Sequence, residues 1–158
     1  MANITIEYMI LIPFLILQIF LLPYATSAIM TYWSTSSETI ALDNANSQIG
    51  GSLQQLYFFL NNPSVSAGTV TNDLNVAPFI GNYPYIGNAT LISVSSSGSA
   101  TVLELTLRLI GSKISVTSPF SLGPNAQWLN STFMSNSTTA SITAHKDSNN
   151  TILLSFST

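Results

Sequence analysis

The hydrophobic pattern of the chain begins with an uninterrupted apolar run from Tyr8 to Trp33. These 26 residues contain no Lys, Arg, Asp, Glu or His, and the uncharged stretch continues to Ser37. About 20 apolar residues already cross a bilayer as a helix, because each residue adds ~1.5 Å. A helix that is apolar on every side must be covered by lipid or by other helices. Residues 1–37 are therefore predicted to form a membrane or assembly segment.

Residues 38–62 show a second pattern, in which apolar residues recur every three or four positions. This spacing places them along one face of an amphipathic helix. The apolar set is Leu42, Ala45, Ile49, Leu53, Leu56 and Leu60, and the polar residues expected on the other side are Asn44, Asn46, Gln48 and Gln54. Pro63 is expected to stop the helix, since the residue before a proline avoids the α region. The sequence thus predicts one long helical region over residues 1–62.

From residue 63 onwards the apolar residues alternate with a period of two, which is typical of β-strands. Strands are predicted at residues 89–94, 101–110, 113–117, 141–145 and 151–156. Gly111-Ser112 predicts a tight hairpin between the second and third strands, and residues 62–87 are expected to be a long connection with one or two short strands. The predicted fold is α+β: the long helix followed by an antiparallel β-sandwich or curled sheet over residues 63–158, packed on the amphipathic helical half.

Charge is scarce throughout the chain. Charged residues make up 6% of it, against about 25% in a typical soluble domain. Only three residues are cationic, so phosphate neutralisation, and with it nucleic-acid binding, is excluded. The absence of cysteine excludes disulfides and thiolate sites. A polar but weakly charged surface lacks protection against association, which favours burial in an assembly or a covering of glycan. Few carboxylates also suit an acidic or otherwise harsh exterior.

Candidate catalytic chemistry is sparse. His145 is the single histidine, and it is flanked by Lys146 and Asp147 in a predicted turn. A metal site or a Ser-His-Asp arrangement would have to be built around this one residue. No Gly-rich phosphate loop and no paired carboxylates accompany it. We therefore expect a surface histidine in a protein that is not an enzyme and that has neither a metal site nor a cofactor.

Covalent glycans are the modification that the sequence indicates. Sequons for N-glycosylation begin at Asn88, Asn130, Asn136 and Asn149, and a fifth begins at Asn3. The first four are expected at or beside turns of the C-terminal domain, where a glycan is accommodated and would solvate the uncharged surface. Asn3 enters the apolar helix and is a poor acceptor.

Three observations bear on the role of the N-terminal segment. Glu7 is the only charged residue among the first 37. It is either an interfacial carboxylate favoured by the helix dipole, or a group that pairs with the terminal amine or backbone N–H groups of a neighbouring subunit in a dry core. Pro13 and Pro23 are expected to bend the helix without breaking it, because packed neighbours can satisfy the freed carbonyls. No basic residue precedes the run, as a secretory signal would require, and no basic flank sets an orientation.

The run from Asn3 to Tyr8, followed by aliphatic residues, resembles the class III signal region of archaeal type IV pilin-like proteins. That pattern reads Gln-x-Ser/Thr-x-Glu-Tyr/Phe, so Asn3 stands at the Gln position and Glu7 at the Glu position. The resemblance covers about ten residues. It implies processing between Ala2 and Asn3, although Met1-Ala2 replaces the basic-Gly pair expected before the cut. It also assigns Glu7, Tyr8, Pro13 and Pro23 to the assembly helix.

The same resemblance implies a function. The chain would be a structural subunit of an extracellular archaeal pilus that polymerises through its N-terminal helix into a helical homopolymer for adhesion. A prepilin peptidase, an assembly ATPase and a polytopic membrane platform are the implied partners, and the helix would hold the subunit in the cytoplasmic membrane before assembly. Two alternatives stay open: a monomeric surface protein on a single span, and a minor or archaellum-type subunit.

Overall fold

The computed structural model describes the backbone of residues 2–93 and 101–157. The chain divides into two compact units, Met1–Ser37 and Glu38–Thr158. Helix α1 (Ala2–Leu60) runs through the first unit from Ala2 and opens the second. It continues through Pro13 and Pro23, so the prediction that neither proline breaks it is confirmed. Its end at Leu60 lies just before the predicted stop.

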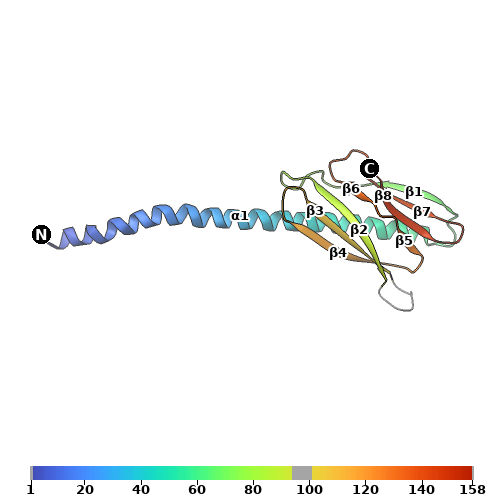
Figure 1. The fold of residues 1–158 in the computed structure, drawn as a ribbon, viewed down its shortest axis with the longest axis horizontal. Coiled ribbons are helices and arrows are strands. Elements are labelled where there is room, and N and C mark those ends of the chain that lie inside the picture. The colour runs from blue at the N-terminus through green and yellow to red at the C-terminus, as the bar shows by residue number, and fades with distance from the viewer. Residues whose placement is uncertain (1, 94–100, 158) are drawn as a thin grey trace. The chain divides into compact units, whose positions relative to one another are not determined.

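The second unit adds eight strands to the helix. They are β1 (Gly68–Asp73), β2 (Tyr85–Ser93), β3 (Thr101–Leu109), β4 (Ser115–Leu122), β5 (Ala126–Trp128), β6 (Thr132–Met134), β7 (Ser141–Lys146) and β8 (Ile152–Ser157). They form two four-stranded sheets with the orders β1-β7-β8-β5 and β4-β3-β2-β6 (Figure 1). The α+β class and the sandwich-like β domain are confirmed.

The strand predictions hold for the long strands and fail for the short ones. The five predicted strands correspond to β2, β3, β4, β7 and β8, and β1 lies within the connection that was expected to hold a short strand. Strands β5 and β6 were not predicted, because three residues carry too little alternation to be recognised. One pairing departs from the antiparallel pattern, since β5 pairs in parallel with β8.

The hairpin between β3 and β4 forms where the glycine predicted it. Leu107 lies opposite Val116, and the Leu109 amide donates to the Ile114 carbonyl at 3.1 Å. Gly111 adopts a φ of +89° in the connection. A residue with a Cβ is strained at such a φ, so glycine is the residue that suits this turn.

One core joins the helix to the sheets in the second unit. Alternate residues of β3, including Leu103, Leu105 and Leu107, are completely buried. The helix contributes Leu42, Ile49, Leu53, Tyr57 and Leu60 to the same cluster, with Ala45 and Leu56 partly buried beside it. The predicted apolar stripe is thereby confirmed. Burying one large aliphatic side chain stabilises a fold by about 1.5–3 kcal/mol, so this stripe anchors the second half of the helix.

Asn46 corrects the predicted polar face. It was expected on the side away from the domain, yet its side chain is fully buried. The spacing explains this, because Asn46 lies between Leu42 and Ile49 on the same helical stripe. Its amide nitrogen donates to the Leu105 carbonyl (3.2 Å) and to the Ser118 hydroxyl (2.9 Å), tying α1 to β3 and β4. A buried polar group requires such partners.

Glycine allows another close contact between helix and sheet. A Cβ built on Gly50 would overlap the ring of Phe120, which belongs to β4. The approaching group is an aromatic side chain, and it lies on Gly50, while Gly51 has no such neighbour within 4 Å.

Candidate functional site

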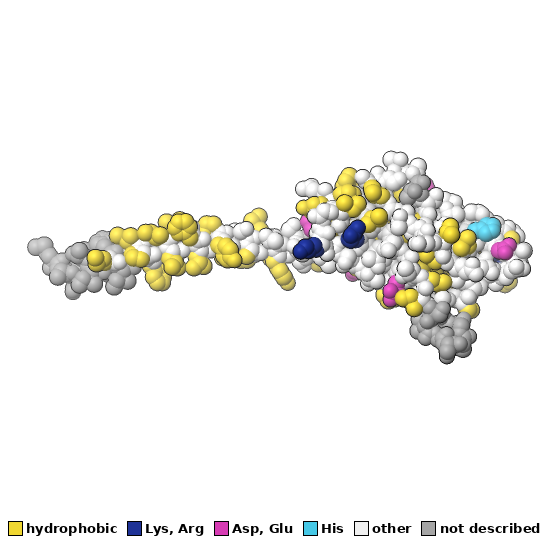
Figure 2. All heavy atoms as spheres, in the orientation of Figure 1, with side chains coloured by type: hydrophobic (Ala, Val, Ile, Leu, Met, Phe, Trp, Pro, Cys, Tyr) yellow, Lys and Arg dark blue, Asp and Glu magenta, His cyan; other side chains and the backbone are white. Residues whose placement is uncertain are grey.

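The first candidate site is the apolar segment of the N-terminal unit. Large side chains from Met9 to Trp33 are exposed around the helix; Phe20, Tyr24 and Trp33 have exposed fractions of 75%, 78% and 73%. Figure 2 shows the hydrophobic side chains spread along both edges of this segment. A soluble monomer rarely exposes more than a few hundred Å² of continuous apolar surface. The stretch Leu11–Leu60 also contains a window of mean hydropathy 1.8, apolar enough for a membrane span.

A shallow groove marks one face of this segment. It has a volume of about 680 Å³ and is lined by Pro13, Ile16, Leu17, Phe20, Leu21 and Tyr24. The lining positions are separated by three and four residues, so they share one side of the helix. Side chains of another helix can enter such a groove, as in ridges-into-grooves packing. The groove thus offers a packing surface with no charged group.

Three threonine hydroxyls in this segment are satisfied by the helix itself. Thr26 donates to the Leu22 carbonyl at 2.8 Å, and Thr31 donates to the Ser27 carbonyl at 2.9 Å. Thr35 repeats the arrangement with the carbonyl of Thr31. Because a lone hydroxyl is costly to bury, these bonds make the segment suitable for lipid or for a dry helical core.

The residues predicted for processing and subunit pairing lie at the start of α1. The backbone of Ala2, Asn3, Glu7 and Tyr8 is helical. Their side chains lie outside the described residues, so the proposed pairing of Glu7 stays a prediction. Pro13 is one of the groove residues, whereas Pro23 lies between groove positions Leu21 and Tyr24 without lining it.

The four predicted glycosylation sites in the second unit all have exposed side chains. Asn130 lies between β5 and β6, Asn136 follows β6, and Asn149 lies in the turn between β7 and β8. Asn88 departs from the prediction. It lies inside β2, opposite Thr106 of β3 and Thr132 of β6, and not at a turn.

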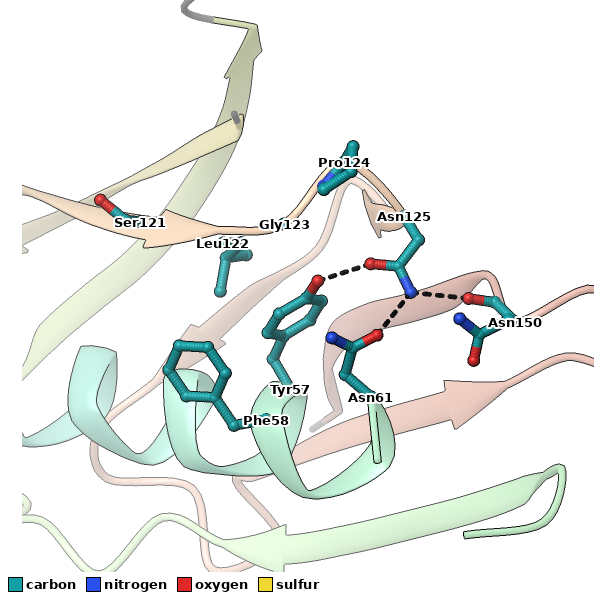
Figure 3. A pocket seen from close by; sticks show the side chains of 9 residues that line it. All are labelled: Tyr57, Phe58, Asn61, Ser121, Leu122, Gly123, Pro124, Asn125 and Asn150. Atoms are coloured by element: carbon teal, nitrogen blue, oxygen red, sulfur yellow. Dashed lines mark hydrogen bonds between the residues drawn. The ribbon is translucent and has the colours of Figure 1, made fainter. Parts of the chain in front are cut away.

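The second candidate site is a pocket of about 520 Å³ in the β-containing unit (Figure 3). Tyr57, Phe58 and Asn61 reach it from the end of α1, while Asn125 and Asn150 reach it from two loops. Nine residues line the pocket and none is charged. Three amide side chains therefore meet two aromatic rings in an uncharged depression.

Asn125 organises the polar side of this pocket. Its side-chain oxygen accepts a hydrogen bond from the Tyr57 hydroxyl. Its amide nitrogen donates to Asn61 Oδ1 at 2.9 Å and to the Asn150 carbonyl at 2.7 Å (Figure 3). These three bonds connect the helix end with both loops. A Cβ on Gly123 would overlap the Tyr57 hydroxyl, so the adjacent loop approaches the tyrosine closely because it has glycine there.

Sequence reasoning did not find this pocket. Its residues come from the helix end, from the segment between β4 and β5, and from the turn between β7 and β8. A left-handed φ of 61° at Asn150 is compatible with such a turn, where asparagine is favoured. No spacing in the sequence indicates that these separate segments meet.

His145 lies at an exposed position of β7, within the predicted strand 141–145, in line with the expected surface histidine. Its Nδ1 is 2.8 Å from the hydroxyl of Thr69 on β1. Within residues 2–93 and 101–157, no group of three or more His, Asp and Glu side chains is arranged to hold a metal ion.

Comparisons with protein-family models, curated proteins and solved structures found no match for this chain. The architecture alone defines a class. A long apolar N-terminal helix is followed by a β-sheet domain, which is a type IV pilin-like arrangement.

Proposed function

We propose that this protein is the structural subunit of an extracellular archaeal type IV pilus and that it polymerises through the first part of α1. The observation that carries the proposal is the apolar surface along residues 9–33, where large hydrophobic side chains are exposed and no described side chain is charged. Lipid covers it before assembly and the helices of other subunits cover it afterwards. The satisfied threonine hydroxyls and the uncharged groove support both environments.

The β-containing unit then forms the outer surface of the filament. Its weak charge fits subunits packed side by side, and its exposed sequons would add glycans to the faces left in contact with solvent. Adhesion is the role that the resemblance implies. The prepilin peptidase, assembly ATPase and membrane platform belong to the proposal on the same ground.

Shearing of cells tests the assembly. We expect fibres in the sheared fraction, visible by electron microscopy, in which this chain is the dominant band. Mass spectrometry of that band should place the mature N-terminus at Asn3 and find glycan on one or more of the four exposed sequons. A chain that stays with the membrane and dissolves in detergent as a monomer would instead identify a single-span surface protein. A minority band in the fibres would identify a minor subunit.

Substitution of Glu7 tests the pairing within the proposed core. We expect Glu7→Leu to insert into the membrane normally and to lose fibre formation, because the partner amine or N–H groups would be left unpaired in a dry core. The control Asp43→Asn removes an exposed carboxylate from the same helix and should assemble as wild type. Normal fibres from Glu7→Leu would refute the pairing and leave the filament proposal standing.

A further inference from the structure

The pocket at the end of α1 has an unused hydrogen-bonding capacity. Asn61 accepts from Asn125 through Oδ1, which directs its amide nitrogen away from that bond. In the described part of the chain neither this nitrogen nor the side-chain amide of Asn150 has a hydrogen-bond partner. A primary amide carries two donors and a carbonyl acceptor. The pocket therefore presents hydrogen-bond donors and an acceptor that no other described residue binds.

An exposed aromatic ring lines the same pocket as these amides. Phe58 is 61% exposed although it lines the pocket. Its ring meets the buried ring of Tyr57 edge to face, with centroids 5.5 Å apart and an interplanar angle of 67°. Tyr57 is in turn held by Asn125. Phe58 thus offers an apolar surface to the pocket, and Figure 3 shows the Tyr57 ring between it and the amides of Asn61 and Asn125.

The chemistry of the pocket selects one class of ligand. An ion has no countercharge among the lining residues. A purely apolar ligand would cover the amides and leave them unsatisfied, which is costly. A neutral molecule with one apolar face and several hydroxyl groups meets both requirements. The volume of about 520 Å³ lies within the ~300–1,000 Å³ of typical small-molecule sites.

We propose that this pocket binds a neutral saccharide, whose apolar ring face packs on Phe58 and whose hydroxyl groups bond to the amides of Asn61 and Asn150. The binding does not require assembly, whereas its use in adhesion rests on the proposed function. The sugar has two sources. One is free or surface-displayed saccharide, and the other is the glycan of the sequon at Asn149, the residue next to Asn150.

The test uses the full chain in detergent micelles, produced in a bacterial host without N-glycosylation and labelled at its phenylalanine rings. Neutral hexoses, N-acetylhexosamines and their disaccharides are titrated and the ring signals are followed by NMR. We expect millimolar binding that shifts the Phe58 signal. Phe58→Ala should weaken it by about tenfold or more, while Phe59→Ala should not. Phe59 is the matched control because it is 57% exposed and does not line the pocket.

A second variant separates ligand contact from folding. Asn150→Gly removes the side-chain amide and tolerates the left-handed backbone, since glycine populates this region freely. It should keep the melting temperature of the parent chain and lose saccharide affinity. Binding that is equal in the parent, Phe58→Ala and Asn150→Gly would place the sugar elsewhere and overturn the proposal.

The source of the sugar is decided with chain purified from its native cells. If free saccharides do not bind but a glycan on Asn149 gives cross-peaks to the Phe58 ring, the pocket holds the chain's own glycan. If neither free saccharide nor attached glycan contacts Phe58, the proposal is wrong. Fibre formation is measured in a separate experiment. A failure of saccharide binding is therefore distinguishable from a failure of the chain to assemble.

Discussion

Lys146 donates a hydrogen bond to the main-chain oxygen of Asn62 at 3.0 Å, two residues after helix α1 ends. A second bond from the same ammonium reaches the Val65 carbonyl at 2.8 Å. The side chain is only 5% exposed, which is unusual for a lysine. One of the three cations in the chain thus connects β7 to the segment that leaves the helix.

Replacing this lysine should destabilise the β-containing unit. Lys146→Met keeps most of the aliphatic stem but removes both charge-assisted bonds, each of which is worth about 1.5–3 kcal/mol. We expect a loss of about 2 kcal/mol or more in the free energy of unfolding, measured by urea denaturation of the full chain in a mild detergent. Lys113→Met is the control, because Lys113 is exposed and should tolerate the change. If Lys146→Met and Lys113→Met had the same urea denaturation midpoint, the two hydrogen bonds of Lys146 would contribute nothing to stability.

Asn46 should be intolerant of a charge. Asn46→Asp replaces the donor that serves Leu105 and Ser118 with a buried carboxylate, and an uncompensated buried charge costs about 3–5 kcal/mol. Burial raises the pKa of the introduced carboxyl above its unfolded value. The loss of stability should therefore be smallest below about pH 4 and should grow as the pH rises. Asn44→Asp, at an exposed position of the same helix, should change the melting temperature little at any pH.

Tyr85 should make the fold sensitive to alkali. Burial raises the pKa of Tyr85 to about 12, and its buried hydroxyl has no hydrogen-bond partner among the described residues. The folded pKa of Tyr85 lies above the unfolded value of about 10. Ionisation of Tyr85 therefore leaves the free energy of unfolding unchanged below pH 10 and lowers it by about 2–3 kcal/mol as the pH reaches 12.

Tyr85→Phe provides the comparison for that titration. The variant removes an unsatisfied hydroxyl and keeps the ring, whose centroid lies 6.3 Å from that of Phe133. We expect it to be at least as stable as the parent at pH 7 and to unfold less readily between pH 10 and 12. If the parent and the variant gave the same alkaline unfolding curve, the sensitivity of the fold to alkali would come from other tyrosines.

Gly87 should be more sensitive to substitution than the other strand glycine, Gly68. A Cβ at Gly87 would overlap the side chains of Phe133 and Leu107, which are both buried in the core. Overpacking of this kind costs about 1–3 kcal/mol, so Gly87→Ala should lower the melting temperature by several degrees. Gly68→Ala in β1 meets nothing within 4 Å and should be neutral or slightly stabilising. A neutral Gly87→Ala would mean that the sheet relaxes around the added methyl.

The sequence predicted the elements whose residues carry a strong local period. The apolar run predicted the exposed helical segment, the spacing from Leu42 to Leu60 predicted the buried stripe, and the alternation in β3 predicted its inward face. Gly111 also located the β3–β4 hairpin, because turn chemistry is local. The pattern failed at Asn46, where a polar residue occupies a core position and its partners lie 59 and 72 residues away.

The sequence by itself determined that α1 has an apolar part and an amphipathic part and that a β domain follows, since periodicity acts between near neighbours. The tertiary structure alone decided the parallel pairing of β5 with β8, the burial of Lys146 beneath the end of α1, and the pocket around Asn125. Each of these depends on contacts between segments far apart in the chain. Such contacts arise when the sheets and the helix bury a common core, and no local pattern of residues encodes them.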